Sequence, residues 1–350
     1  MLSDKERKIR TGIIGLGKMG ILHSALINMI PKAELVSLHD SNRKLSKYVK
    51  KSGLNVIFYS NLDQMLENAG LEAVFVCTPP YTHFSLAQRC LAHNLDLFVE
   101  KPLAESLESA KKMFSLVEDK ETIHSTGYNI AHFPIFRKAK AILDENVLER
   151  LFRFNFSIYI SQVFSKKKGW FFDKGKSGGG VVIDIASHLI YLLIWYFGIP
   201  QKIYAKTLNF FSSVEDAATV MMEYENGMCG LLDADWSVPG YRLSTIEIIL
   251  EGKNGIMEIT NNHIKLNLYR ATPNFSRGWT ILHRIDLSSS SQFDLGSEGF
   301  YEEDSHFVEC CLDRNRPHVT WLEGLEVQRV IEAIYRSAEL NQPVNLDNIK

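Results

Sequence analysis

The chain has 350 residues, which is enough for one large domain or two ordinary ones. Apolar residue types make up 45% and charged types 23%, the composition of a soluble globular protein. The formal net charge is only −2, so no excess of basic side chains would attract nucleic acid or an anionic membrane, and we expect neither as a partner.

The sequence also predicts a cytoplasmic location. The first eight residues are polar or charged and lack the apolar core of a secretory signal. The five cysteines show no CxxC or metal-ligand spacing, so we predict no metal site, and their odd number fits reduced thiols better than a disulfide framework. The most apolar run, residues 189–197, is too short to cross a bilayer and predicts a buried helix.

Strand-like and helix-like segments alternate through the first 128 residues. Short apolar runs predict strands at residues 9–14, 33–38, 55–59, 73–77, 95–99 and 122–126. Helical patterns between them cover residues 22–29, 62–68, 84–92 and 107–119. This alternation predicts an α/β domain with a doubly wound parallel sheet that is covered on both faces.

The pattern changes after about residue 128. Helices are predicted at residues 134–145, 183–197, 300–313 and 321–340, and strands at 151–160, 202–211, 217–224, 228–236, 244–250, 255–259 and 264–269. Asn226-Gly227 between two of these strands predicts a hairpin, because the turn needs a residue with positive φ. We therefore expect an α+β domain with a predominantly antiparallel open sheet at residues 129–350.

A glycine-rich motif, GxGxxG, follows the first predicted strand and opens a helix. The first glycine permits a tight turn, the second lets a pyrophosphate approach the backbone, and the third allows close packing of helix and strand. The N–H groups of the helix start would then face the phosphates. The residues of this turn are Gly15, Leu16, Gly17, Lys18, Met19 and Gly20.

An acidic residue, Asp40, ends the second predicted strand, 20 residues after the motif. A carboxylate at this place accepts hydrogen bonds from the ribose hydroxyls of a dinucleotide. It favours NAD, because it would repel the 2′-phosphate of NADP. Arg43 nearby could offset that repulsion, so NADP stays the alternative cofactor.

Two further loops are predicted at the carboxyl edge of the same sheet, where such folds bind ligands. Glu100-Lys101-Pro102 follows the fifth strand, and Pro102 restricts Lys101 to an extended backbone that gives its ammonium group a fixed direction. Thr78, Pro79 and His83 follow the fourth strand. The alternatives are an ordinary charged loop for the first and a solvated surface loop for His83.

Asp184 and His188 lie four residues apart in the helix predicted at 183–197, so they would share one face of it. Their neighbours are apolar, and burying both would cost free energy unless they pair with each other or with a ligand. A neutral imidazole beside a carboxylate can take a proton from a hydroxyl group near physiological pH. The alternative is a structural hydrogen-bonded pair.

Taken in order, these motifs resemble the Gfo/Idh/MocA family, which includes glucose–fructose oxidoreductase and inositol dehydrogenase. The resemblance covers essentially the whole chain. It rests on GLGKMG at 15–20, TPPYTH at 78–83, EKP at 100–102, GGG-x3-D-x3-H at 178–188, and an ending at 323–338 that looks like the family's last helix.

The resemblance implies a Rossmann domain at residues 1–128 that binds the cofactor and a domain at 129–350 that binds substrate and forms a homodimer or homotetramer, with substrate in the cleft between the domains. By position, Lys101 would bind substrate and relay protons, His188 would be the acid/base, and Asp184 would orient the substrate or the imidazole. Around the cofactor would lie Gly15, Gly17, Asp40, Thr78, Pro79, His83, Glu100 and Lys101, with Asn129 nearby.

We therefore predict an NAD(P)-dependent dehydrogenase that moves a hydride between nicotinamide and a secondary alcohol of a sugar, polyol or nucleotide sugar. Either Lys101 or His188 would take the hydroxyl proton. Two alternatives stay open, namely an NAD-dependent glycosidase that oxidises its substrate transiently and a non-catalytic dinucleotide-binding regulator. A regulator would have no need for Lys101, Asp184 and His188 together.

One segment departs from the family pattern. Many members carry an arginine after the sixth strand, where residues 127–134 of this chain read GYNIAHFP. We expect His132 either to replace that arginine or to be a surface residue at a helix start, and the identity of the substrate stays open for this reason.

Overall fold

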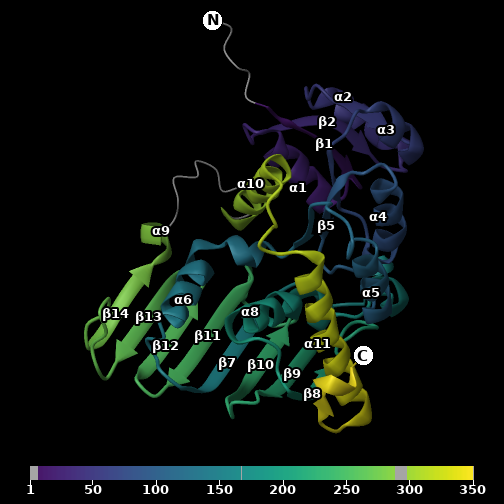
Figure 1. Ribbon diagram of the computed structural model, residues 1–350. Coiled ribbons are helices and arrows are strands. Elements are labelled where there is room, and N and C mark those ends of the chain that lie inside the picture. The colour runs from purple at the N-terminus through teal and green to yellow at the C-terminus, as the bar shows by residue number, and fades with distance from the viewer. Residues whose placement is uncertain (1–6, 167, 288–297, 350) are drawn as a thin grey trace, which may run out of the picture. The chain divides into compact units, whose positions relative to one another are not determined.

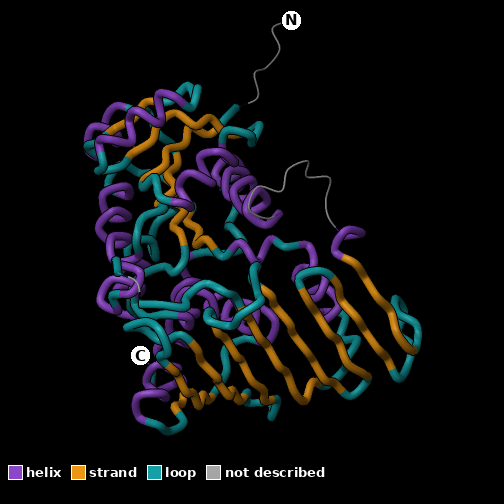
Figure 2. Tube along the Cα trace, turned by 180° about the vertical axis from the view of Figure 1, so that it is seen from behind, coloured by secondary structure: helices purple, strands orange, loops and turns teal. Residues whose placement is uncertain are grey.

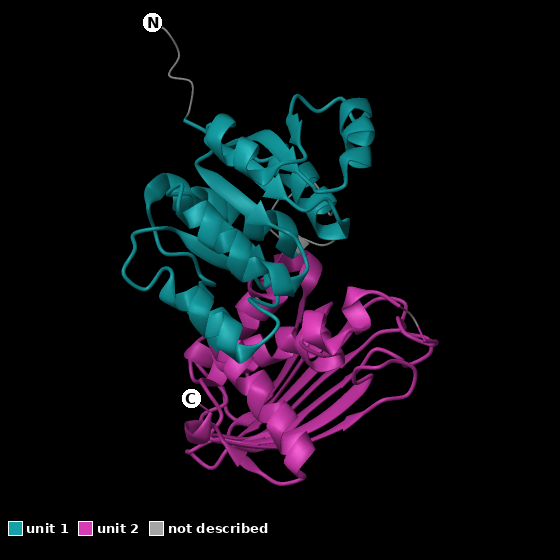
Figure 3. Ribbon diagram, turned by 90° about the vertical axis from the view of Figure 1, so that its right-hand side faces the viewer, with its two compact units in different colours: residues 1–129, 292–325 teal, residues 130–291, 326–350 magenta. Residues whose placement is uncertain are grey.

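The computed structural model of the chain describes residues 7–166, 168–287 and 298–349. The chain folds into two compact units, of which the first comprises Met1–Asn129 with Gln292–Leu325 and the second comprises Ile130–Ser291 with Glu326–Lys350 (Figure 3). The expected division fell at residue 128 alone, so the return of a late segment to the first unit was not foreseen. The functions expected for the two domains stay predictions.

The first unit is built on a six-stranded parallel sheet with the order β3-β2-β1-β4-β5-β6 (Figure 1). This is the strand order of a Rossmann fold, and it confirms the predicted doubly wound sheet. The strands are β1 (Ile9–Ile14), β2 (Ala33–His39), β3 (Ile57–Tyr59), β4 (Ala73–Val76), β5 (Asp96–Glu100) and β6 (His124–Gly127). The helices are α1 (Lys18–Ile27), α2 (Ser46–Lys51), α3 (Leu62–Asn68), α4 (His83–Leu91), α5 (Leu107–Ser115) and α10 (Glu298–Asp313).

Both faces of this sheet are covered. Successive side chains of a strand point to opposite sides of the sheet, so each strand contributes to two separate cores. Phe75 and Phe98 lie on one side in a core cluster with Phe307 of α10. Val76 and Val99 lie on the other side, in the cluster to which α3, α4 and α5 contribute. The segment that carries α10 therefore belongs to the first unit, because it supplies part of the core on one face of the sheet.

The second unit contains a nine-stranded sheet with the order β14-β13-β12-β11-β7-β10-β9-β8-β15. Only the β7–β10 pair is parallel, which confirms the predicted predominantly antiparallel sheet. The strands are β7 (Leu151–Tyr159), β8 (Lys202–Leu208), β9 (Ala217–Glu223), β10 (Cys229–Asp235), β11 (Thr245–Gly252), β12 (Gly255–Thr260), β13 (His263–Leu268), β14 (Gly278–His283) and β15 (Val344–Asn345).

Long helices cover one face of this second sheet (Figure 1), and the view from behind shows the strands of the other face (Figure 2). These helices are α6 (Pro134–Asp144), α8 (Ser187–Phe197) and α11 (Trp321–Leu340). By length and composition alone the helical residues Lys174–Phe197 could cross a membrane, but 67% of their most apolar window is buried inside the structure. This burial is typical of a core helix.

The predicted hairpin at Asn226-Gly227 joins β9 to β10. Gly227 has a φ of +83°, and the N–H of Met228 donates to Oδ1 of Asn226 at 2.9 Å. No element was predicted for the segments that form β14 and α2. The other strands of both large sheets were predicted to within a few residues, with the exception of the two-residue β15.

Candidate active site

The glycine turn between β1 and α1 is shaped by packing at two of its three glycines. A Cβ at Gly20 would lie 1.8 Å from the carbonyl oxygen of Gly15, and a Cβ at Gly15 would lie 2.6 Å from Cγ2 of Thr78. Gly15 also has a φ of +93°, which favours glycine. At Gly17, in contrast, φ is −72° and no described atom lies within 4 Å of the Cβ position. The protein itself gives no reason for glycine there, and the open space leaves room for a ligand against the backbone.

Helix α1 begins at Lys18, directly after this open position. In the described part of the chain no side chain caps its start, and its first turn holds no acidic residue. The N–H groups at the start of a helix have no partner within the helix, and together with the helix dipole they attract anions. The turn therefore offers both the space and the donors that the pyrophosphate of the expected cofactor requires.

Asp40 lies directly after β2, and its carboxylate reaches the glycine turn. Oδ2 accepts the N–H of Leu16 at 2.9 Å, and Oδ1 accepts the N–H of Asn42 at 2.8 Å. The Asp40 side chain is half-buried, whereas Arg43 is exposed. The carboxylate is thus held at the place where the Rossmann pattern puts the acceptor of the ribose hydroxyls.

His83 connects the loops that follow β4 and β5. Its Nε2 lies 2.8 Å from the carbonyl oxygen of Thr78, its Nδ1 lies 3.1 Å from that of Leu103, and the residue is fully buried. Burial lowers the pKa of His83, so the ring is neutral at physiological pH and donates through one nitrogen at a time. The alternative of a solvated loop is therefore wrong for His83, which holds the segment of Thr78 and Pro79 in place.

The Glu100-Lys101-Pro102 turn ends β5 at the same edge of the sheet. Glu100 is buried; its Oε2 accepts the N–H of Lys101 at 3.0 Å, and its Oε1 lies 2.9 Å from Nε2 of His23 on α1. Lys101 is half-buried, and the Lys101–Pro102 peptide bond is cis. An ordinary charged loop would leave Glu100 in water, so its burial between two partners argues against that alternative. His23 was not among the predicted site residues.

In the second unit, Asp184 and His188 lie at the beginning of the long helix. Asp184 lies in a π-helical turn (Val182–Ala186), His188 follows in α8, and both side chains are half-buried. We expected a regular helix here, and the π turn is a difference of a kind that is frequent at functional sites. That the two side chains share one face, and that they act in catalysis, stay predictions.

The glycine run before this helix is closed by neighbouring side chains and backbone. A Cβ at Gly179 would lie 1.9 Å from Oη of Tyr335, and one at Gly180 would lie 2.1 Å from the carbonyl oxygen of Glu215. Oε1 of buried Glu215 accepts the N–H groups of Gly180 and Val182 at 2.7 and 3.1 Å and the hydroxyl of Tyr335 at 2.8 Å. Glu215 and Tyr335 therefore position the helix start, and neither was among the predicted site residues.

Asn129 and His132 bound a single 3-10 turn, and both are buried, with exposed fractions of 8% and 4%. The alternative of a surface residue is therefore wrong for His132. Trp236 is fully buried and donates through Nε1 to Asp216 at 2.6 Å. It is a core residue.

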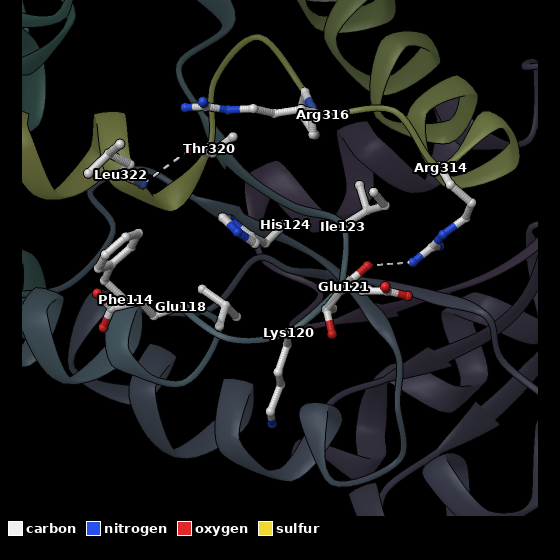
Figure 4. Close-up of a pocket in the computed structure, with 13 residues that line it drawn as sticks. Phe114, Glu118, Lys120, Glu121, Ile123, His124, Arg314, Arg316, Thr320 and Leu322 are labelled. Atoms are coloured by element: carbon white, nitrogen blue, oxygen red, sulfur yellow. Dashed lines mark hydrogen bonds between the residues drawn. The ribbon is translucent and has the colours of Figure 1, made fainter.

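A separate pocket of about 650 Å³ lies at the amino edge of the first unit's sheet, opposite the loops described above (Figure 4). Its two arginines already have partners, since Arg314 pairs with Asp96 at 2.5 Å and Arg316 pairs with Glu323 at 2.8 Å. None of the predicted site residues lines it. We therefore assign no step of the predicted reaction to this pocket.

The strand order, the open glycine turn and the acid after β2 define a dinucleotide-binding Rossmann protein. A family model described as an oxidoreductase family with an NAD-binding Rossmann fold matches residues 9–128, and the GFO/IDH/MocA C-terminal domain model matches residues 136–258. The chain belongs to the Gfo/Idh/MocA family of NAD-binding oxidoreductases, as its motifs predicted.

Known relatives cover the chain to different extents. The scyllo-inositol 2-dehydrogenase (NAD(+)) of Bacillus subtilis is 25% identical over 367 residues, which covers 98% of this chain and 97% of that protein. An uncharacterized oxidoreductase of Schizosaccharomyces pombe is 27% identical over 201 residues, 57% of this chain and only 54% of the relative. A solved levoglucosan dehydrogenase in complex with NADH and levoglucosan has a TM-score of 0.88 at 20% identity, covering 97% of this chain and 100% of that one. This last similarity shows the fold.

Proposed function

We propose that the chain is an NAD-dependent dehydrogenase that transfers a hydride between nicotinamide and a secondary alcohol of a sugar, an inositol-like polyol or a nucleotide sugar. The observation that carries the proposal is the glycine turn, where packing accounts for Gly15 and Gly20 but leaves Gly17 open. The inositol and levoglucosan dehydrogenases among the similar proteins support the substrate class.

Residues of the first unit would bind the cofactor. The backbone from Gly15 to Met19 would hold the pyrophosphate, and Asp40 would accept the ribose hydroxyls and disfavour NADP. When bound, the nicotinamide supplies the hydride chemistry. His83 would act by holding the adjoining loops together, because both of its ring nitrogens face carbonyl oxygens.

The catalytic roles are assigned to Lys101, Asp184 and His188. Lys101 or His188 would take the proton of the substrate hydroxyl, and the Lys101 ammonium group would stabilise the developing alkoxide. Asp184 would orient the substrate or the imidazole of His188. The half-burial of all three side chains supports these roles, because such groups are partly shielded yet reachable by a ligand.

We also propose a homodimer or homotetramer formed through the open face of the nine-stranded sheet. Met221 and Leu231 lie opposite each other on β9 and β10, and Trp279 and Ile281 lie on β14; all four are between 41% and 57% exposed. Exposed apolar side chains on one sheet face favour association with another subunit. Light scattering of the purified chain tests this assembly. A cytoplasmic location is proposed with it, supported by the burial of the apolar helix.

The proposed activity is tested with a panel of sugars, inositols and nucleotide sugars, each with NAD or NADP, by the absorbance of the reduced cofactor. With the best substrate, Lys101→Ala and His188→Ala should each lower turnover by on the order of 10²- to 10⁴-fold. Calorimetry should find NAD affinity within a few-fold of wild type. Lys120→Ala, which removes an exposed lysine near the separate pocket, is the matched control and should leave turnover unchanged.

Three outcomes would contradict parts of this proposal. Unaltered turnover in both variants would refute the catalytic assignment. Product formation without net reduced cofactor would indicate the glycosidase instead. NAD binding without turnover of any substrate would favour the regulator.

A further inference from the structure

A buried group of titratable side chains lies next to Lys101 in the first unit, and the proposed reaction does not use it. It consists of His23 on α1, Glu100 at the end of β5, and Glu303 and Asp304 on α10. Their exposed fractions are 0%, 6%, 2% and 0%, respectively. Burying charged groups is unfavourable unless they are paired and hydrogen-bonded, so this arrangement requires a physical explanation.

His23 bridges two carboxylates. Its Nδ1 lies 2.8 and 2.9 Å from the two carboxylate oxygens of Asp304, and its Nε2 lies 2.9 Å from Oε1 of Glu100. A neutral imidazole carries a single N–H, whereas two carboxylate partners require a proton on both nitrogens. Burial opposes this charge, but Asp304 and Glu100 outweigh burial and raise the pKa of His23 well above its ordinary value. The rings of Phe75 and Phe98 pack on the imidazole at centroid distances of 5.6 and 5.2 Å.

Glu100 carries this contact to Lys101. Oε1 of Glu100 is held by His23, and Oε2 accepts the backbone N–H of Lys101 at 3.0 Å. Because one oxygen of the Glu100 carboxylate is held by a hydrogen bond, the direction of the other oxygen is fixed as well. The chain of contacts from Asp304 through His23 and Glu100 to Lys101 lies within one compact unit.

Two further buried titratable groups interact with these carboxylates, namely Glu303 and, after β4, Cys77. In the described part of the chain, neither carboxyl oxygen of Glu303 has a hydrogen-bond partner. Burial, followed by the charges of Glu100 and Asp304, raises the pKa of Glu303 well above its ordinary value and so favours its neutral form. Burial and these carboxylates likewise raise the pKa of the Cys77 thiol. Among the described residues, the hydrogen-bonding contacts of the His23 ring are with Asp304 and Glu100. Burial raises the pKa of Asp304 above its ordinary value, and His23 opposes that shift.

We propose that His23, held by Asp304, is a positioning residue for Lys101, and that it acts only while its imidazole carries a positive charge. It fixes Glu100, and through the second oxygen of Glu100 it fixes the backbone of Lys101. The inference rests on the proposed function, because the position of Lys101 matters for turnover only if Lys101 acts on the substrate.

The test is Asp304→Asn, which keeps an oxygen acceptor for Nδ1 of His23 but removes the negative charge. We expect kcat/KM near the wild-type value at low pH and at least a tenfold loss, relative to wild type, as rising pH deprotonates His23. NAD affinity should stay within a few-fold of wild type. Comparing variant with wild type at each pH removes the titrations that both proteins share.

A second measurement does not depend on activity. In wild-type protein with ¹⁵N-labelled histidine, the two ring nitrogens of His23, assigned with His23→Gln, should keep the chemical shifts of an imidazolium to well above neutral pH. A neutral ring near neutral pH would overturn the proposal. This measurement decides the matter even if Asp304→Asn fails to fold.

The matched control is Asp96→Asn at the other end of β5. Asp96 is also buried, accepts the N–H of Ile123 at 2.9 Å and pairs with Arg314 at 2.5 Å, but it lies at the amino edge of the sheet. Its loss should lower stability without making kcat/KM pH-dependent relative to wild type. If the profile of Asp304→Asn matches that of this control while Lys101→Ala abolishes turnover, only the positioning role fails. If Lys101→Ala leaves turnover intact, the catalytic role of Lys101 within the proposed function fails first.

Discussion

Each unit has a glycine-rich turn directly before a helix, but the two turns differ in which atoms lie beside their glycines. In the first unit no described atom lies within 4 Å of a Cβ at Gly17, and no described side chain caps the helix start that follows. In the second unit the Cβ positions of Gly179 and Gly180 are taken by Tyr335 and by the backbone of Glu215. One turn is open toward a ligand, and the other is closed by the protein.

The difference shows what each glycine motif does. The N–H groups at a helix start need acceptors, and in the second unit the side chain of Glu215 accepts those of Gly180 and Val182. Glu215 thus supplies from the protein itself the acceptor that a ligand would supply in the first unit. We conclude that the second turn is a scaffold that positions the helix carrying Asp184, whereas the first turn has the open backbone that the proposed cofactor site requires.

Gly180→Ala should break the second turn and give the largest effect. The new Cβ would overlap the carbonyl oxygen of Glu215 at 2.1 Å, and such overpacking costs about 3 kcal/mol of unfolding free energy. Because the helix start would also shift, turnover should fall with stability. Chemical denaturation and the dehydrogenase assay measure both. Wild-type stability would contradict the scaffold role.

Gly17→Ala is the matched substitution in the first turn. The open space and the φ of −72° predict a change in unfolding free energy within about 0.5 kcal/mol. A methyl group between the backbone and the pyrophosphate should nevertheless lower NAD affinity by at least tenfold, measured by calorimetry. Unchanged NAD affinity would remove the contrast between the two turns.

The sequence predicted the fold well where the pattern is local. The central strand β4 and the middle of β5 are continuous apolar runs, because both of their faces are buried, and such runs can be found without any knowledge of contacts. The return of α10 to the first unit was not predictable in this way, because the order of elements along a chain does not say which sheet a late helix covers. The π turn at Asp184 was not predicted either, because its apolar pattern is that of any buried helix.

The residues of the candidate site likewise fall into those that a local pattern predicts and those that it does not. Gly15, Asp40 and Lys101 were predicted because each belongs to a motif or follows a strand at a fixed spacing. The residues that hold these predicted residues and the helix start in place were not predicted, because they form pairs between distant parts of the chain. His23 and Asp304 are 281 residues apart in the chain, and Glu215 and Tyr335 are 120 residues apart. Neither pair leaves a pattern that can be read from one sequence.

Glu215→Gln should give the smallest effect and sharpen the account of the closed turn. Oε1 of Glu215 accepts all three of its hydrogen bonds from Gly180, Val182 and Tyr335, so a glutamine oxygen can accept them without the charge. Burial raises the pKa of Glu215 above its ordinary value of 4.5, although these bonds oppose the shift.

The folded protein therefore holds the Glu215 proton more tightly than the unfolded chain does. The contribution of Glu215 to stability is fully present below pH 4.5 and is lost as pH rises from there through the folded pKa, because in that window the unfolded chain binds fewer protons at this residue. The glutamine variant lacks this loss. The free energy of unfolding of wild type, measured with urea, should therefore be highest relative to that of the variant in acid and lower relative to it at neutral pH. If wild type instead becomes more stable than the variant as pH rises, the ionised carboxylate of Glu215 holds the helix start. The turn would then be an anion site occupied by the protein's own charge, and not a site held by the protonated side chain.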